Sequence, residues 1–265
     1  MPELHSLVCL KVVPKPEEIR VDPETNLLLR QGVRSEINPP DMNAMEMALA
    51  LKDRHGGRVN ILSMGPPSFE PYLRVALSMG ADQVYLLSDL DFAGADTLAT
   101  TYTLAMGVCK IGSVDLVFCG EESSDGATGQ VPAGLAEWLG WDQLSMLTEV
   151  EVDTKRSLAR GRRELKGGHE ILEVPLPCVV SVVTAANEPR FIDYRLKPWA
   201  SEAERVTIWT PADLGAEVER LGLPGSPTVV TGLAQAPTRQ RKREFLRGSL
   251  EQVARSLGEI LLDHI

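Results

Sequence analysis

The chain of 265 residues has little of what several classes of protein depend on. Aromatic side chains make up 5% of it, and its formal net charge is −10 at pH 7, so stacking on bases and attraction to a polyanion are both poorly supported. Its four cysteines lie far apart and form no CxxC pair, so we expect no metal site. No run of about 18 apolar residues occurs and the start lacks a signal-peptide pattern, so we expect a cytoplasmic protein.

Groupings typical of catalytic side chains are also missing. The four histidines are dispersed along the chain in terminal or turn contexts, and no Ser/His/Asp or Cys/His arrangement can be argued from them. We therefore expect no catalytic residue.

The first half of the chain alternates strand-like apolar runs with helix-like segments at short intervals. This pattern predicts an α/β fold with a doubly wound, mostly parallel sheet. Strands are expected at 6–13, 58–64, 83–89 and 115–119, and helices at 44–54, 69–79, 97–110 and 131–139. From about residue 145, charged and glycine turns predict an antiparallel extension, with a hairpin turn at 166–168 and a buried strand from Cys178.

The composition changes again near residue 187. We expect residues 1–187 to form a nucleotide-binding domain and residues 188–265 to form a recognition loop and a C-terminal arm. Because the arm has few continuous apolar runs, it cannot bury a core alone, and a partner subunit is the natural support. It ends in an amphipathic helix, whose apolar stripe more often docks on its own chain.

Residues 115–140 are the most informative segment, since an apolar strand runs into a small polar loop that opens directly into a helix. Glycines permit close approach of a ligand, hydroxyls can donate, and the helix start attracts an anion. The residues concerned are Ser123, Ser124, Gly126, Thr128 and Gly129. The alternative is an ordinary loop in which Thr128 or Asp125 caps the helix, and the loop alone leaves both interpretations open.

Several segments, taken in order, resemble the β subunit of electron transfer flavoprotein, a family that includes the FixA-type subunits. They are LVCLKVVPKPEEIRVDPETNLLLRQGV with INPPDMNAMEMALALKD, VNILSMGPPSFEPYLRVALSMGADQVYLLSD, FAGADTLAT, DGATGQV and ANEPRF. The resemblance implies an adenine-nucleotide α-hydrolase-like fold and a heterodimer with an α subunit that holds a redox-active FAD. It further implies a second nucleotide in this subunit, which is AMP in simple members and a second FAD that accepts hydride from NADH in electron-bifurcating members.

The resemblance also implies which residues bind that nucleotide. They are Cys9, Asn38, Pro39, Pro40, Asp41, Met64, Gly65, Asp125, Gly126, Ala127, Thr128, Gly129, Gln130 and Val131. All follow the carboxyl ends of expected strands, where open α/β sheets bind ligands. The local alternatives are a plain turn before a helix with Asp41 as its N-cap, and a tight turn at Met64-Gly65.

Residues 92–100, FAGADTLAT, bear on which nucleotide is bound. Together with 221–228, LGLPGSPT, they resemble members that carry a second FAD, so Asp96 and Thr97 are expected near a flavin and FAD is favoured over AMP. The local alternative is that Asp96 only caps the helix beginning at Thr97.

The chain departs from the family pattern at the phosphate loop, where Ala127 also stands in place of an often acidic residue, and at the recognition arm. Glu121-Glu122 stands where a basic-Gln pair is usual, and carboxylates near a phosphate would repel it unless they point away. The recognition arm is replaced by FIDYRLKPWASEAER, in which Tyr194 and Trp199 would anchor a partner if both face solvent. The alternative is that both rings pack against the rest of this chain.

These observations predict an electron carrier subunit. It would help to hold the FAD of the α subunit, bind AMP or a second FAD, and present an arm to an acyl-CoA dehydrogenase or another flavin dehydrogenase, with a quinone oxidoreductase as a further partner. An NADH-oxidising bifurcating subunit is one alternative and a non-redox adenine-nucleotide sensor is another. An ATP-cleaving enzyme would need a basic residue in the loop, and residues 120–131 contain none.

Overall fold

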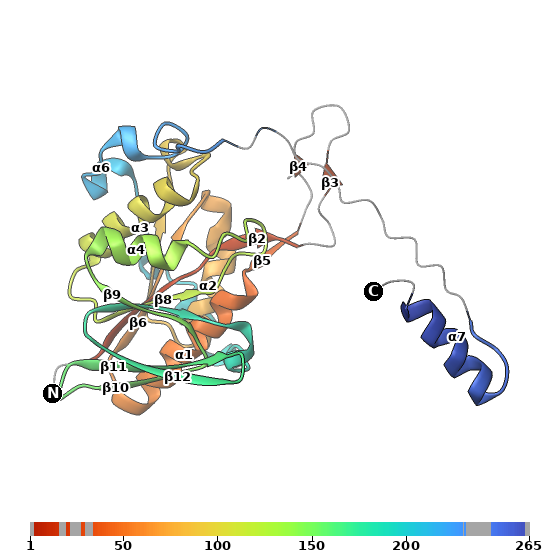
Figure 1. Cartoon of the computed structure of the whole chain (residues 1–265). Helices are drawn as coiled ribbons and strands as arrows, with labels where there is room; N and C mark the ends of the chain where they lie inside the picture. The colour runs from red at the N-terminus through yellow and green to blue at the C-terminus, as the bar shows by residue number, and fades with distance from the viewer. Residues whose placement is uncertain are drawn as a thin grey trace. The chain divides into compact units, whose positions relative to one another are not determined.

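A computed structural model of the chain describes residues 3–15, 20–21, 28–29, 34–229, 231 and 245–262. The chain forms two compact units, residues 1–232 and residues 233–265 (Figure 1). In the part that the structure describes, no helix has both the length and the apolar character needed to cross a membrane.

The first unit is built around a parallel sheet with the strand order β14-β7-β6-β1-β8-β13-β9. The strands are β1 (His5–Cys9), β6 (Arg58–Met64), β7 (Gln83–Leu87), β8 (Leu116–Gly120), β9 (Asp142–Leu147), β13 (Cys178–Val182) and β14 (Val206–Trp209). Residues of β1, β8 and β13 are all buried, as expected for parallel strands covered on both faces. The predicted α/β architecture is confirmed.

Helices cover both faces of this sheet (Figure 1). They are α1 (Pro39–His55), α2 (Glu70–Met79), α3 (Thr97–Ile111) and α4 (Val131–Leu139), with the shorter α5 (Lys197–Ala200) and α6 (Pro211–Leu214). Alternate strand residues point to opposite faces, so Val8 packs in one cluster with Met45 of α1, and Leu7 in another with Leu135 of α4. Single 3₁₀ turns connect the elements: η2 (Pro67–Phe69), η3 (Leu90–Phe92), η4 (Thr184–Ala186), η5 (Tyr194–Leu196), η6 (Ala203–Arg205) and η7 (Val218–Arg220).

A three-stranded antiparallel sheet, β10 (Glu149–Asp153), β11 (Leu158–Leu165) and β12 (Gly168–Pro175), packs against the α1 face. Leu165 pairs with Gly168, which confirms the hairpin predicted at 166–168. Val150 and Val152 of β10 are buried in the same core as α1, so this sheet covers that helix.

The strand predicted at 6–13 is in fact two. β1 ends at Cys9, and β2 (Val12–Pro14) pairs antiparallel with β5 (Ser35–Ile37). The chain bends between them because the N–H of Lys11 is bound by the carboxylate of Asp41 rather than by a neighbouring strand. A second short pair is formed by β3 (Arg20–Val21) and β4 (Leu28–Leu29).

The first unit extends well past residue 187, where a boundary was expected. The side chain of Asn187 donates to the carbonyl of Asn43 at 3.0 Å, and Arg190 pairs with Glu46 at 2.9 Å, so both residues are tied to α1. β14 then joins the edge of the main sheet, and Trp209 stacks on Tyr85 of β7 with ring centroids 4.5 Å apart. The chain therefore divides at 232 and not at 187, because a short apolar strand completes the sheet within the irregular stretch.

The second unit contains the predicted terminal helix, α7 (Leu250–Leu262). Its leucine side chains are largely exposed, including Leu250 and Leu261. The basic run at 239–247 lies for the most part outside the described residues.

Candidate functional site

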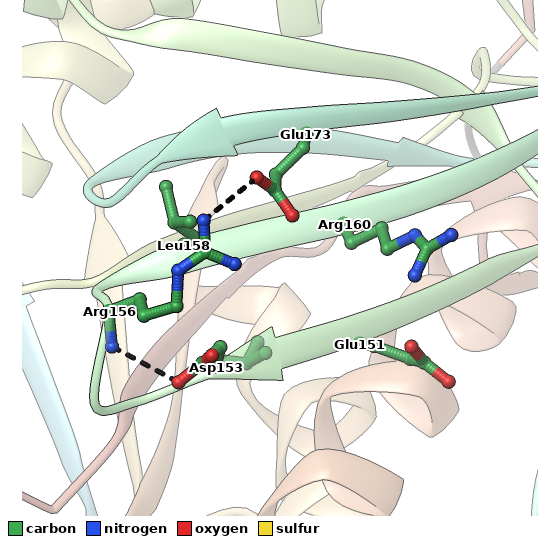
Figure 2. A pocket seen from close by; sticks show the side chains of 7 residues that line it. Glu151, Asp153, Arg156, Leu158, Arg160 and Glu173 are labelled. Atoms are coloured by element: carbon green, nitrogen blue, oxygen red, sulfur yellow. Dashed lines mark hydrogen bonds and ion pairs between the residues drawn. The ribbon is translucent and has the colours of Figure 1, made fainter.

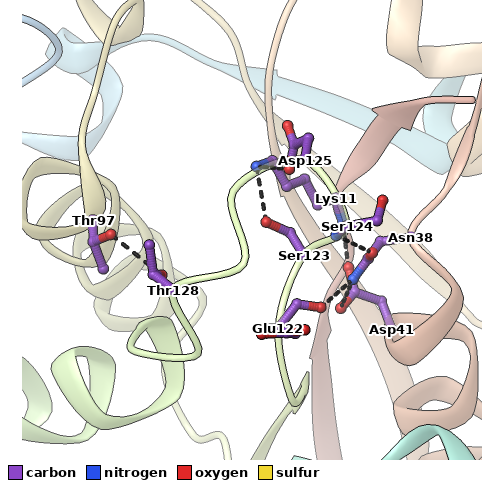
Figure 3. A network of polar contacts seen from close by, with 9 residues as sticks. All are labelled: Lys11, Asn38, Asp41, Thr97, Glu122, Ser123, Ser124, Asp125 and Thr128. Atoms are coloured by element: carbon purple, nitrogen blue, oxygen red, sulfur yellow. Dashed lines mark hydrogen bonds and ion pairs between the residues drawn. The ribbon is translucent and has the colours of Figure 1, made fainter. Parts of the chain in front are cut away.

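The carboxyl ends of β1 and β8 lie side by side at the point where the chain changes direction across the sheet. After β1 the chain adds β6 and β7 on one side, and it then crosses to place β8 on the other side of β1. Open α/β sheets bind ligands in the crevice at such a switch point. The predicted phosphate loop, the start of α1 and the segment after β1 all meet there (Figure 3).

Asn38, at the start of α1, fixes the conformation of the loop that follows β8. Its amide nitrogen donates to the backbone oxygen of Glu122 at 2.8 Å, and its side-chain oxygen accepts from the N–H of Ser124 at 3.1 Å. Asn38 is fully buried, so its side chain supports the loop from beneath.

Asp41 joins the ends of the two strands. Its carboxylate accepts hydrogen bonds from the backbone N–H of Lys11 at 2.7 Å, the N–H of Gly120 at 3.2 Å and the side chain of Asn38 at 3.0 Å. Burial raises the pKa of Asp41 to about 7, although these three donors favour its ionised form. The expected N-cap role was wrong: Asn38 occupies the N-cap position of α1, and Asp41 binds other segments instead.

Lys11, which was not among the residues predicted from the sequence, approaches the loop from the end of β1. Its ammonium nitrogen lies 2.6 Å from Oδ1 of Asp125 and 3.2 Å from Oγ of Ser123. Although burial raises the pKa of Asp125, the Lys11 ammonium lowers it below its ordinary value. The available signal was a lysine interrupting the apolar run 6–13 at the carboxyl end of a parallel strand.

The helix that follows the loop has no side-chain cap. Gln130 occupies the N-cap position of α4 without such a bond, and Thr128 Oγ1 is 3.5 Å from the N–H of Gln130. Asp125 is engaged by Lys11, so the structure does not show the alternative in which Asp125 or Thr128 caps α4. Pro132 has no N–H and the N–H of Gly134 donates to the carbonyl of Gln130 at 2.9 Å, so the N–H groups of Val131 and Ala133 are the ones available to an anion in the first turn of α4.

The loop backbone is strained at one position. Ala127 has a φ of 47°, in the left-handed region that residues other than glycine rarely adopt, and Gly129 has a φ of 62°. A non-glycine residue held there costs about 1 kcal/mol, and such residues cluster at ligand sites. The carboxylate of Glu121, which was expected to repel a phosphate unless it pointed away, accepts from the N–H and hydroxyl of Thr184 at 3.0 and 2.9 Å.

Asp96 caps α3, as the local alternative predicted, and it does more than that. Its Oδ1 accepts from the N–H groups of Leu98 and Ala99, at 3.0 and 3.1 Å. Its Oδ2 accepts from the N–H and hydroxyl of Thr228 at 3.0 and 2.6 Å, and its own N–H donates to Ser226. Asp96 therefore clamps together the two segments, 92–100 and 221–228, that were singled out separately from the sequence.

Thr97, the next residue, reaches the phosphate loop, and its hydroxyl lies 3.4 Å from that of Thr128. The Asp96 clamp is thus adjacent to the loop. Asp96 itself is already bound by four donors, so its carboxylate holds protein segments in place.

Three other predicted nucleotide contacts lie at strand ends. Cys9 is buried at the end of β1 beside Cys119 of β8, and hydrogen bonding to Cys9 together with burial raises the pKa of the Cys119 thiol. Met64 is partly buried at the end of β6, the strand next to β1. Gly65 lies so close to the ring of Phe69 that a Cβ atom would overlap it, which accounts for glycine at this tight turn.

The two predicted partner anchors differ in exposure. Tyr194 is 70% exposed, with Lys197 over its ring. Trp199 is partly buried against the core, with the Arg205 guanidinium 4.4 Å from the ring centroid. Phe191, which the sequence analysis did not single out, is 97% exposed.

A shallow cavity of about 210 Å³ opens on the three-stranded sheet (Figure 2). Its lining alternates in charge: Glu151 and Asp153 face Arg156 and Arg160, and Arg156 pairs with Glu173 at 3.7 Å. It shares no residue with the crevice between β1 and β8. Among the residues described, no group of three or more His, Cys, Asp or Glu side chains is placed to hold a metal ion.

Comparison with known proteins gives concordant matches. A family model described as "Electron transfer flavoprotein domain" matches residues 25–214. Protein FixA of Azorhizobium caulinodans is 45% identical, over 90% of this chain and 87% of its own length. The electron transfer flavoprotein subunit beta of Clostridium acetobutylicum is 42% identical over 86% of each chain, and the caffeyl-CoA reductase-Etf complex subunit CarD of Acetobacterium woodii is 39% identical over 96% of each.

Proposed function

Because the chain belongs to the electron transfer flavoprotein β-subunit family that includes FixA, as its motifs predicted, we propose that it works as an electron carrier subunit. With an α subunit it passes electrons from an acyl-CoA dehydrogenase or another flavin dehydrogenase to a downstream acceptor such as a quinone oxidoreductase. FAD supplies the redox chemistry when bound. The residues of this chain bind and orient the cofactor, and they exclude water from it.

The crevice between β1 and β8 is the proposed site of an adenine nucleotide in this subunit. The observation that carries the proposal is the uncapped start of α4, preceded by a strained, exposed loop that Asn38 holds in place. Such a start binds phosphate through its N–H groups and its positive dipole end. The adenosine would lie by the turn at 38–41 and the backbone of Cys9.

We favour a second FAD over AMP as this nucleotide. Asp96 brings segments 92–100 and 221–228 together next to Thr128, and the joined segments carry exposed leucines. These leucines are Leu98 and Leu223, and the exposed Leu90 lies two residues before the first segment. An apolar rim beside a phosphate site suits a flat ring system better than it suits a mononucleotide. NADH oxidation by such a flavin is the alternative activity that would follow.

The deciding experiment is the nucleotide content of the full chain co-purified with its α subunit, measured by chromatography after denaturation. Two FAD per heterodimer are expected. One FAD and one AMP would make this a one-flavin carrier and would contradict the proposed role of the Asp96 clamp. Absence of any flavin would favour the non-redox nucleotide sensor.

The lack of a basic residue in the loop no longer argues against the ATP-cleaving alternative, because the side chain of Lys11 reaches the loop from β1. Phosphoryl transfer also requires carboxylates that hold a metal ion, and the described residues offer no such group of three. We expect no ADP or AMP to form when the complex is incubated with ATP and Mg²⁺, and steady release of either would contradict the carrier function.

Tyr194 is the proposed anchor for the electron-donating dehydrogenase, with the neighbouring Phe191 as a second contact. Exposed aromatic rings are typical of the residues that dominate interfaces. Trp199 would support this surface from beneath, since it packs on the core. Tyr194→Ala should raise the KM of the dehydrogenase for the complex without changing its flavin content. The exposed stripe of α7 is the proposed contact with the α subunit.

A further inference from the structure

The phosphate loop is acidic in sequence, yet a cation reaches it in the structure. Residues 120–131 contain Glu121, Glu122 and Asp125 and no lysine or arginine. Lys11 arrives from the end of β1, on the neighbouring strand, and its ammonium group lies against Asp125 and Ser123 (Figure 3).

The position of Lys11 is set by its backbone. The buried carboxylate of Asp41 accepts from the N–H of Lys11 at 2.7 Å and from the N–H of Gly120 at the other strand end. The Lys11 side chain therefore starts from a fixed point at the switch point of the sheet. Its outer part is accessible to a ligand, because the side chain is 46% exposed.

We propose that Lys11 is the cationic ligand for the phosphate of the bound adenine nucleotide, and that Asp125 holds its ammonium group in place until the phosphate displaces the Asp125 carboxylate. This inference rests on the proposed nucleotide function, and it goes beyond it by assigning a binding residue outside the loop. It also changes the role of Asp125 from a ligand contact to a temporary counter-ion.

The exchange is favourable on electrostatic grounds. The pair between Lys11 and Asp125 is partly exposed, with 46% and 28% of the two side chains accessible, so water screens it. A nucleotide phosphate carries more negative charge than a carboxylate and offers several acceptor oxygens. It is also attracted by the uncapped start of α4, which Asp125 does not cap.

The test uses the full chain in complex with its α subunit, freed of exchangeable nucleotide, with AMP and adenosine as probes in equilibrium dialysis. Lys11→Met should raise the Kd for AMP by about tenfold or more, the effect of losing one charge-assisted hydrogen bond. The Kd for adenosine, which lacks the phosphate, should stay within about twofold. Lys11→Arg keeps the charge and should recover most of the AMP affinity.

Lys15→Met is the matched control, because Lys15 is similarly exposed and pairs with Glu36 at 3.6 Å on the β2–β5 ribbon. It should leave both affinities unchanged. Asp125→Asn should lower the Kd for AMP, because it removes the competing carboxylate while Lys11 remains. It also keeps the proposal testable if Lys11→Met fails to fold.

The outcomes separate the two ideas. An AMP affinity for Lys11→Met within about twofold of wild type overturns the assignment of Lys11. A Kd for Asp125→Asn equal to or above the wild-type value overturns the displacement of Asp125. A wild-type complex that binds neither AMP nor adenosine would instead contradict the proposed nucleotide site itself.

Discussion

The buried carboxyl of Asp41 should give the protein an unusual dependence of stability on pH. Burial raises the pKa of Asp41 to about 7 in the folded protein, whereas an unfolded chain has a value of about 3.9. Between these values the folded state binds the proton and the unfolded state does not. The free energy of unfolding must therefore fall as pH rises through this window, which is the reverse of the behaviour of a salt-bridged aspartate.

The size of the effect follows from the two pKa values. Between pH 5 and pH 8 the folded carboxyl loses its proton while the unfolded one is already ionised, so this group should remove about 2.5 kcal/mol of stability. Asp41→Asn cannot ionise. Its amide has a single acceptor oxygen, so either the N–H of Lys11 or the donors from Asn38 and Gly120 lose their acceptor, at a pH-independent cost of about 1–3 kcal/mol.

The assay is urea unfolding of the wild type and of Asp41→Asn at pH 5 and pH 8, followed by tryptophan fluorescence. All four tryptophans lie between residues 138 and 209, so the signal reports on the first unit. Taking the difference between the two proteins cancels the titration of distant groups. Asp91→Asn, an exposed site with the same chemical change, controls for the lost charge.

The difference in free energy of unfolding between the wild type and Asp41→Asn should shrink on going from pH 5 to pH 8, because the wild type alone loses stability through Asp41. If that difference instead stays the same from pH 5 to pH 8, the three N–H donors outweigh desolvation and Asp41 is ionised throughout. The reasoning from burial would then be refuted.

Two further predictions concern other polar contacts. Asp96→Ala should lower the free energy of unfolding by about 1–2 kcal/mol, because it removes the cap of α3, and it should expose 221–228 to limited proteolysis. Thr228→Val should expose that segment with little loss of the cap, and wild-type resistance to protease in both variants would argue against the clamp. Burial, aided by Arg58, lowers the pKa of His5, so the wild type should lose stability relative to His5→Gln as pH falls from 7 to 5. A relative gain on acidification would mean that Asp115 stabilises a charged imidazole; urea unfolding measures both.

Local signals in the sequence were sufficient for most of the fold. The strand at 58–64 and the helix at 131–139 begin and end as predicted, because an apolar run or a glycine stop defines each limit. Asp96 as a cap was likewise predictable, since capping needs only the next three residues. Such features depend on neighbours in the chain.

Contacts between distant segments were harder to predict. β14 was missed because its four residues become a strand only when β7 offers an edge and Tyr85 a stacking surface. The bend that divides 6–13 into two strands depends on Asp41, which lies 30 residues beyond Lys11. In both cases the determining contact comes from a distant part of the chain and leaves no pattern in the segment's own sequence.

The site shows why composition of a loop is a weak guide to its chemistry. The absence of a basic residue in 120–131 argued against an ATP-cleaving enzyme, yet the fold brings Lys11 to within 2.6 Å of Asp125, 114 residues away. The same folding step turns Glu121 toward Thr184 and leaves the start of α4 uncapped. The charge that a nucleotide would meet is therefore set by how β1, α1 and β8 converge. Asp41 and Asn38, whose side chains are buried beneath the loop, determine that convergence, and substitutions there should alter nucleotide affinity by moving the loop.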